Sequence, residues 1–154
     1  MSVSTRDTVG PQVDVRGPRF AAWITTGILV AVLILTAFSP VAAAALLALQ
    51  TIVFALGALL GPRRSPYGTL FAQFVAPRLG APAETEPVAP LRFAQLVGFV
   101  FALVGTASFF AGSTVVGSVA TGFALFAALM NAAFGVCLGC RLYPLVARMR
   151  RATA

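Results

Sequence analysis

Two cysteines, Cys137 and Cys140, form the pattern in this sequence that is most typical of a chemical function. A C-x-x-C pair can form a reversible disulfide, carry sulfur or bind a soft metal ion. In a continuous helix the two sulfurs would lie on adjacent turns of one face. Arg141 follows directly, and its charge could stabilise a thiolate, whereas a helix C-terminus or surrounding lipid would disfavour one.

The sequence leaves three interpretations of this pair open. The first is thiol redox or sulfur transfer at Cys137 and Cys140. The second is metal ligation in a homo-oligomer, because one chain supplies only two of four tetrahedral ligands. The third is that two small apolar residues pack without doing chemistry. The chain has no histidine, which excludes His-based triads and zinc–histidine motifs, and no cofactor is predicted.

The composition of the chain is typical of a membrane protein. Of its 154 residues, 59% are hydrophobic and 10% are charged, against roughly 25% charged residues in soluble domains. The mean hydropathy is +0.94, and these values exclude an ordinary water-soluble domain and a disordered chain. The net charge of +7 comes from scattered arginines, so a nucleic-acid partner is excluded and the lipid bilayer is expected instead.

Four uncharged apolar runs are each long enough to cross a bilayer. A hydrocarbon core of about 30 Å needs about 20 helical residues, and in lipid such a run satisfies its own backbone hydrogen bonds only as a helix. None of the runs alternates polar and apolar residues as a barrel strand would. The prediction is an all-α membrane protein with four transmembrane helices, at Phe20–Phe38, Val41–Leu60, Phe93–Ala111 and Val115–Val136.

Short turns pair these helices as two tandem hairpins, and the arginines orient them. All eleven basic residues lie before the first run, between the hairpins or after the last run, and neither short turn carries one. The positive-inside rule therefore places both termini in the cytoplasm. The expected segments are a cytoplasmic tail at 1–19, a first hairpin at 20–60, a cytoplasmic loop at 61–92, a second hairpin at 93–140 and a basic cytoplasmic tail at 141–154.

A cleaved signal peptide is the alternative for the first run, because small residues follow it from Pro40 to Ala44. The run is longer than the usual apolar region of about 7–15 residues, and the next run begins at once. A transmembrane helix is therefore the favoured interpretation.

The middle segment divides into two parts. Tyr67 to Val75 places its large apolar side chains, Leu70, Phe71, Phe74 and Val75, on one face of a short helix. This pattern predicts a helix that lies in the membrane interface. Gly80 to Pro90 is rich in proline and alanine, which predicts an extended, solvated linker.

The two halves of the chain share a weak repeat. Arg19-Phe20-Ala21 opens the first hairpin, Arg92-Phe93-Ala94 opens the second, and Gly61 matches Gly135. Parallel repeats occur in some transporters, but an Arg-Phe-Ala segment could also simply mark the cytoplasmic start of a helix. Small residues four apart predict close helix packing, within the bundle or between subunits. These are Gly57 and Gly61, Gly117 and Thr121, Ser118 and Gly122, and Gly135 and Gly139.

A few polar residues lie within the apolar runs: Gln50, Gln95, Asn131 and the pair Thr25-Thr26. Such groups usually form hydrogen bonds between helices in a membrane. The alternative is that they line a pathway.

The ending Phe134-Gly135-Val136-Cys137-Leu138-Gly139-Cys140-Arg141-Leu142-Tyr143 resembles the F-G-x-C-x-G-C-x-x-Y ending of a bacterial membrane family catalogued as domain of unknown function 4395. Three further blocks are similar to that family, at Val13 to Phe20, Gly61 to Tyr67 and Leu91 to Ala94, so the resemblance covers about residues 13–147. The composition is similar to that of actinobacterial members. Some members begin with an additional Cys-Pro that this chain lacks, so a three-thiol site is not expected.

The resemblance implies a small four-helix protein of the bacterial inner (plasma) membrane, in a family without an established activity. Gene neighbours of that family imply a cytoplasmic thioredoxin-like or sulfurtransferase partner. The leading functional hypothesis is a membrane component of cytoplasmic thiol redox or sulfur handling at Cys137 and Cys140. Because the cytoplasm is reducing, a permanent structural disulfide is not expected there. The alternatives are a small scaffold or accessory subunit, and a transporter of a neutral or sulfur-containing solute.

Overall fold

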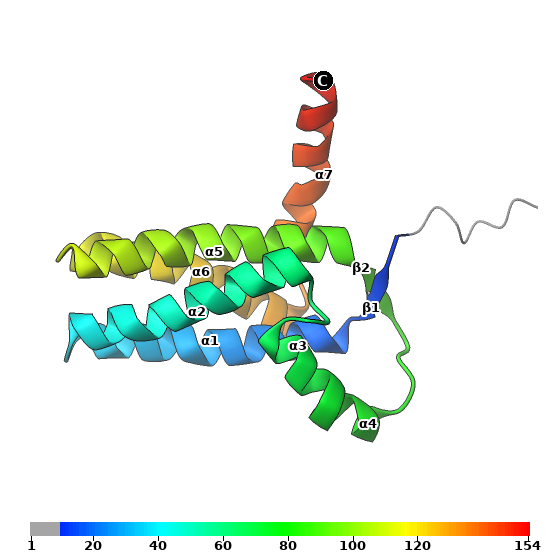
Figure 1. The fold of residues 1–154 in the computed structure, drawn as a ribbon, viewed down its shortest axis with the longest axis horizontal. Coiled ribbons are helices and arrows are strands. Elements are labelled where there is room, and N and C mark those ends of the chain that lie inside the picture. The colour runs from blue at the N-terminus through cyan, green and yellow to red at the C-terminus, as the bar shows by residue number, and fades with distance from the viewer. Residues whose placement is uncertain (1–9) are drawn as a thin grey trace, which may run out of the picture.

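The computed structural model describes residues 10–154. Residues 1–9 of the expected tail at 1–19, Arg6 among them, lie outside the described residues. Figure 1 shows a helical bundle with short elements at one end. The elements in chain order are β1 (Gln12–Asp14), α1 (Arg16–Thr36), α2 (Pro40–Leu60), α3 (Pro66–Leu70), the π-helical turn η2 (Phe71–Val75), α4 (Ala76–Leu79), β2 (Thr85–Pro87), α5 (Val88–Phe110), α6 (Thr114–Phe134) and α7 (Leu138–Ala152).

Four of these helices, α1, α2, α5 and α6, are long and apolar enough to span a membrane. These four candidate spans agree with the predicted number of membrane helices and imply association with a lipid bilayer. Local signals set their ends. The Ser39 hydroxyl accepts the backbone N–H of Ala42 at the start of α2, and Gly112, with a φ of 83°, turns the chain between α5 and α6.

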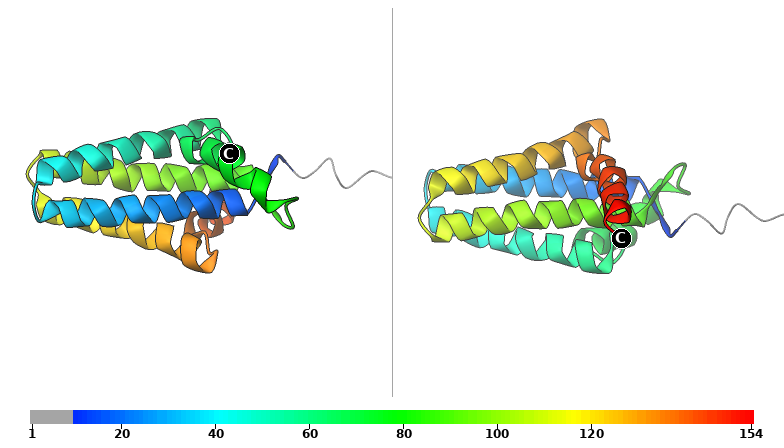
Figure 2. Two further views of the ribbon diagram at one scale, coloured as in Figure 1. Left: turned by 90° about the horizontal axis from the view of Figure 1, so that it is seen from below. Right: turned by 90° about the horizontal axis from the view of Figure 1, so that it is seen from above.

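The four helices form a bundle in which α1 and α5 occupy equivalent positions, as Figures 1 and 2 show. Each of these two helices contacts both α2 and α6. The closely packed core lies in the half of the bundle near the two short turns, where Leu29, Val32 and Leu47 are fully buried. Many outward-facing side chains, such as Ile34 and Val100, are apolar and exposed, as expected for a surface that faces lipid.

The two Arg-Phe-Ala segments make equivalent contacts. Arg92 donates to the carbonyl oxygens of Ala58 (2.7 Å) and Leu59 (2.8 Å) at the end of α2. Arg19 donates to the carbonyl oxygen of Ala132 (3.4 Å) near the end of α6. Each arginine therefore donates hydrogen bonds to carbonyl groups at the end of a helix in the other hairpin, where these groups have no partner within the helix. These matched contacts favour a true repeat over a shared helix-start signal.

The segments that follow each hairpin also match. Gly61 ends α2 with a φ of 87°, and Gly135 ends α6 with a φ of 66°. After the first hairpin, the ring of Phe71 packs 5.7 Å from that of Phe20. After the second hairpin, the rings of Tyr143 and Phe93 lie 6.0 Å apart. The two hairpins and their following segments are therefore related by an approximate two-fold arrangement.

The predicted G-x-x-x-G faces are wrong in detail, because Gly61 and Gly135 are helix-ending residues rather than members of a packed face. The other glycine of each of these two pairs, Gly57 and Gly139, does lie close to a neighbouring helix. A Cβ on Gly57 would meet Gln95, and a Cβ on Gly139 would meet Ala94. The predicted pair of Gly117 and Thr121 packs as expected, because these two residues of α6 lie against Gly105 of α5.

The linker predicted at Gly80 to Pro90 is only partly extended and solvated. Thr85–Pro87 forms β2, which pairs antiparallel with β1 so that Val13 lies opposite Glu86. The next residues, from Val88 onward, already belong to α5. The ribbon is fixed to α4 by Arg16, which pairs with Asp14 (2.8 Å) and donates to the carbonyl oxygens of Leu79 and Gly80.

The short helix predicted at Tyr67 to Val75 exists, but its apolar face is divided. Phe71 is buried against Gly17 of α1, whereas Leu70 and Phe74 are exposed. Inside the bundle, Gln50 donates to the Thr25 hydroxyl (3.4 Å) and accepts from the Tyr67 hydroxyl (2.6 Å). Burial raises the pKa of Tyr67. The Gln50 interactions are therefore the hydrogen bonds between helices that the sequence predicts.

Candidate functional site

The cysteine pair lies at the start of a separate helix rather than at the end of the fourth span. The helix α6 stops at Phe134, and Gly135 adopts the left-handed conformation. Cys137 is extended, with φ −82° and ψ 102°, and is the N-cap of α7. The fourth span predicted to Val136 and the second hairpin predicted to 140 are thus too long, because the chain turns at Gly135 before it reaches the cysteines.

This position reverses the expected electrostatics of the pair. The Cys137 sulfur accepts the backbone N–H of Cys140 at 3.3 Å, as an N-cap side chain does. The N-terminus of a helix carries partial positive charge and free N–H donors, which stabilise a thiolate. The prediction that a nearby helix C-terminus disfavours a thiolate is wrong for Cys137, which lies at a helix N-terminus.

Cys137 and Cys140 are joined as a disulfide in the structure, with their Cα atoms 5.2 Å apart. This Cα separation is within the range of about 4.4–6.8 Å that a disulfide requires. Both residues are partly buried. The first turn of α7 therefore brings the two sulfurs together without a change in the backbone.

Close packing on α5 fixes the first turn of α7. A Cβ on Gly139 would lie 2.6 Å from both the Cα and the Cβ of Ala94, so only glycine fits between the cysteines at that position. The ring contact between Tyr143 and Phe93 continues the packing one turn further along α7. The two cysteines are thus held against α5, one of the four candidate membrane spans.

A shallow outer pocket of about 310 Å³ contains both cysteines. Its lining also includes Arg141 and Glu86, which β2 brings to the site. Burial raises the pKa of Glu86; the Arg19 charge opposes that rise, and the Glu84 charge adds to it. Arg141, predicted as a thiolate stabiliser, lines this pocket with an exposed side chain. The sequence offers no signal that would place Glu86 beside the cysteines, because its position depends on the pairing of β2 with β1.

The raised pKa of Glu86 gives a testable pH dependence. Because the folded protein holds this proton more tightly than the unfolded chain, the free energy of unfolding falls as pH rises above the ordinary value of 4.5. Glu86→Gln is therefore expected to raise the melting temperature in detergent at about pH 7 and to leave it nearly unchanged at about pH 4.

Asp14 provides the matched control of opposite sign. The hydrogen bond from Arg16 holds the pKa of Asp14 below 3.8, so its stabilisation is present at neutral pH and is lost as pH falls through the folded pKa. Asp14→Asn is expected to lower the melting temperature at about pH 7. A Glu86→Gln variant that is less stable than the parent at that pH would contradict the assignment.

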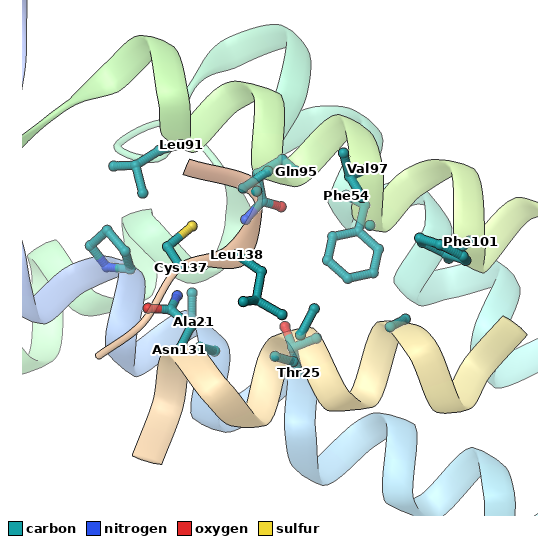
Figure 3. A pocket seen from close by; sticks show the side chains of 18 of the residues that line it. Ala21, Thr25, Phe54, Leu91, Gln95, Val97, Phe101, Asn131, Cys137 and Leu138 are labelled. Carbon is teal, nitrogen blue, oxygen red and sulfur yellow. The ribbon is translucent and has the colours of Figure 1, made fainter. Parts of the chain in front are cut away.

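A second, larger cavity of about 370 Å³ lies on the other side of Cys137, inside the bundle. Its walls come from α1, α2, α5, α6 and the first turn of α7. Figure 3 shows Cys137 and Leu138 among its lining residues, with Gln95 on α5 and Asn131 on α6. Cys137 lines both pockets, whereas Cys140 lines only the outer one.

The two carboxamides in this cavity differ from the other polar groups of the bundle. Within residues 10–154, the side chains of Gln95 and Asn131 make no hydrogen bond to protein atoms, although both are partly buried. The expectation that such groups pair between helices holds for Gln50 and not for these two. Gln95 and Asn131 instead fit the second interpretation given by the sequence, in which polar side chains line an internal space.

The described part of the chain offers no complete metal site. No group of three or more His, Cys, Asp or Glu side chains comes together within residues 10–154. Cys137 and Cys140 could therefore complete a metal site only together with ligands from a second chain. A metal site shared between two chains stays a prediction.

Comparison with known proteins gives one match. A family model described as "Domain of unknown function (DUF4395)" matches residues 13–148, which is most of the chain and includes both cysteines. No curated protein and no solved structure matches.

Proposed function

The chain belongs to the DUF4395 family, whose description assigns no activity, and we propose that it exchanges thiols and disulfides at a membrane surface. Cys137 and Cys140 cycle between a dithiol and a disulfide. The partner is a soluble dithiol protein of the thioredoxin-like kind, or a sulfurtransferase. The observation that carries the proposal is the position of Cys137 as the N-cap of α7, with its sulfur accepting the N–H of Cys140.

The exchange begins at the sulfur that faces only the outer pocket. A partner thiolate attacks Cys140, the bond between the two cysteines breaks, and the electron pair goes to Cys137. The helix N-terminus stabilises this leaving thiolate, and a stabilised leaving group speeds exchange. The second thiol of the partner then attacks its own sulfur in the mixed disulfide and releases Cys140, which takes up the proton. The partner is oxidised by two electrons and the cysteine pair is reduced by two.

The proposed compartment is the cytoplasmic face of a bacterial inner membrane, with both termini in the cytoplasm. Within residues 10–154 the arginines lie on the elements at one end of the bundle and the opposite turns carry none (Figure 1), which supports this orientation. In a reducing compartment the disulfide is a transient member of a cycle rather than a permanent crosslink. Membrane-impermeant maleimide is expected to label the reduced cysteines in inverted vesicles and not in intact cells.

The packing does not favour transport of a solute through the bundle. The cavity beside Cys137 is confined to one half of the molecule. In the other half Leu29, Leu47 and Thr121 are fully buried and fill the space between the helices. A solute would have to displace this core, which is costly in a close-packed interior.

Single-thiol variants test the proposal directly, because the chain has two cysteines. Cys140→Ser leaves Cys137, and Cys137→Ser leaves Cys140 as the matched control. After reduction, iodoacetamide at about pH 7 is expected to alkylate Cys137 at least about tenfold faster than Cys140, because the helix N-terminus favours its thiolate. Arg141→Gln in the Cys140→Ser background is expected to slow alkylation by about two- to fivefold, as for loss of an exposed charge.

The exchange itself is measured with reduced thioredoxin as the probe. The oxidised parent chain is expected to accept electrons from it, and both single-thiol variants are expected to lose this activity. Equal alkylation rates at the two cysteines, together with no reduction of the parent chain by thioredoxin, would overturn the proposal.

A further inference from the structure

We propose that the cavity between the two hairpins binds the ring of a lipid-soluble quinone, which accepts the two electrons of the Cys137–Cys140 dithiol. This inference rests on the proposed thiol exchange and names the oxidant that would regenerate the disulfide. It starts from the position of Cys137, which lines the cavity on one side and the outer pocket on the other.

The walls of the cavity select a neutral, apolar occupant. Its volume of about 370 Å³ lies in the range of about 300–1,000 Å³ found for small-molecule sites. Among the described residues that line it, none carries a charge, and aromatic side chains contribute from three helices. These are Phe54 on α2, Phe101 on α5, and Phe123 and Phe126 on α6. A charged oxidant such as a nucleotide would have no partner here, and its desolvation would oppose binding.

Lipid has direct access to the residues around this cavity. Phe123 and Phe126 line the cavity and are also 58% and 55% exposed. The ring of Phe123 stacks on that of Phe101 at 5.7 Å, so the pair stands between α5 and α6 where these helices meet lipid. A membrane-soluble molecule can therefore enter from the side by moving two aromatic rings.

Gln95 and Asn131 provide hydrogen bonds for a molecule with two carbonyl groups. The oxygen of Gln95 rests against Gly57, and Figure 3 draws its amide nitrogen on the side of Cys137. Asn131 approaches from α6, so the two carboxamides come from different walls. The other two polar side chains of the lining already have partners: Thr25 accepts from Gln50, and Ser65 bonds to Pro62 and Gly68. A quinone ring has two carbonyl acceptors, which suits two donors that come from different walls.

The electron transfer balances between the dithiol and the ring. The Cys137 thiolate adds to a ring carbon of the quinone, and a proton reaches one carbonyl oxygen. The Cys140 thiolate then attacks the Cys137 sulfur, the sulfur–carbon bond breaks, and its electron pair returns to the ring, where the second oxygen is protonated. Two thiols become one disulfide, and the quinone becomes a quinol with the two thiol protons. Glu86 lines the pocket of Cys140 and is placed to relay one of them.

The test uses the full chain in lipid nanodiscs, reduced and freed of excess reductant, with decylubiquinone as the probe. Quinone absorbance and free thiols are followed together. We expect one quinone to be reduced for each chain, with loss of two thiols. The double variant Gln95→Leu and Asn131→Leu is expected to lower the second-order rate constant of quinone reduction by about tenfold or more. It should leave Cys137 alkylation and exchange with thioredoxin unchanged.

Thr26→Val is the matched control, because Thr26 is a buried hydroxyl bonded to the carbonyl oxygen of Ala22 on its own helix and does not line the cavity. It is expected to reduce quinone at the parent rate. If the parent chain exchanges with thioredoxin but does not reduce decylubiquinone, this inference is overturned and the proposed function stands. If neither reaction occurs, both fail. Parent kinetics in the Gln95 and Asn131 double variant would overturn the placement of the quinone in this cavity.

Discussion

Replacing Gly139 with valine is expected to lift the first turn of α7 off α5 and to abolish thiol exchange at the cysteine pair. The new Cβ would lie 2.6 Å from the Cα and the Cβ of Ala94, and a backbone atom cannot move aside as a flexible side chain can. Overpacking of this kind costs about 1–3 kcal/mol. Because the displaced turn carries both cysteines, we expect a lower melting temperature in detergent and at least about a tenfold loss of exchange with thioredoxin.

Two further variants make this prediction specific. Gly122 lies in α6 with no atom within 4 Å of its Cβ position, so Gly122→Val is expected to leave stability and exchange unchanged or slightly improved. Gly139→Ala is the milder change, and the addition of Ala94→Gly removes one of the two atoms in its way. That pair should recover part of the lost activity, and a Gly139→Val chain with parent activity would show that α7 does not need its contact with α5.

Replacing Gly68 with alanine is expected to displace α3 from its position beside Pro62. The added Cβ would lie 1.7 Å from the carbonyl oxygen of Pro62, a distance that no rotamer relieves. We expect a loss of about 3 kcal/mol or more in the free energy of unfolding. Because Tyr67 lies in the same turn, its hydrogen bond to Gln50 should also be lost.

A phenol titration in the Tyr143→Phe background measures this second effect, because Tyr67 is then the one tyrosine left. Burial raises the pKa of Tyr67 in the parent chain, so its phenolate absorbance should appear at lower pH in the Gly68→Ala variant, near the ordinary pKa of about 10. Gly27→Ala is the control, since nothing lies within 4 Å of its Cβ position. An unchanged Tyr67 titration in Gly68→Ala would contradict the crowding at Pro62.

The four membrane helices could be predicted from the sequence because lipid leaves an apolar run of that length only one backbone structure. The end of α6 could not be predicted in the same way. Phe134, Gly135 and Val136 are uncharged, so hydropathy continues across the point where the chain turns. The residue that marks the end of α6 is Gly135, which has a φ of 66°. Its spacing from Gly139 favours interpretation as a packing residue instead.

The candidate site was predicted in part. The cysteines were identified, and Arg141 shares the outer pocket with them. Glu86 could not be placed, because its position depends on the pairing of β1 with β2, two short strands that are far apart in the sequence. Likewise, the sequence named Gln95 and Asn131 but not their common cavity, which depends on how the two hairpins pack.

The approximate two-fold arrangement has a consequence for where a pair of cysteines can lie in this chain. The turn after each hairpin is capped in the same way: Ser65 accepts the N–H of Gly68, and Cys137 accepts the N–H of Cys140. The two turns are thus similar in structure, but Gly68, which occupies in the first turn the position that Cys140 has in the second, is crowded by Pro62 and admits no side chain. A side chain is excluded at this position of the first turn, whereas the second turn accommodates Cys140. Steric exclusion therefore leaves room for a pair of cysteines at only one of the two similar turns.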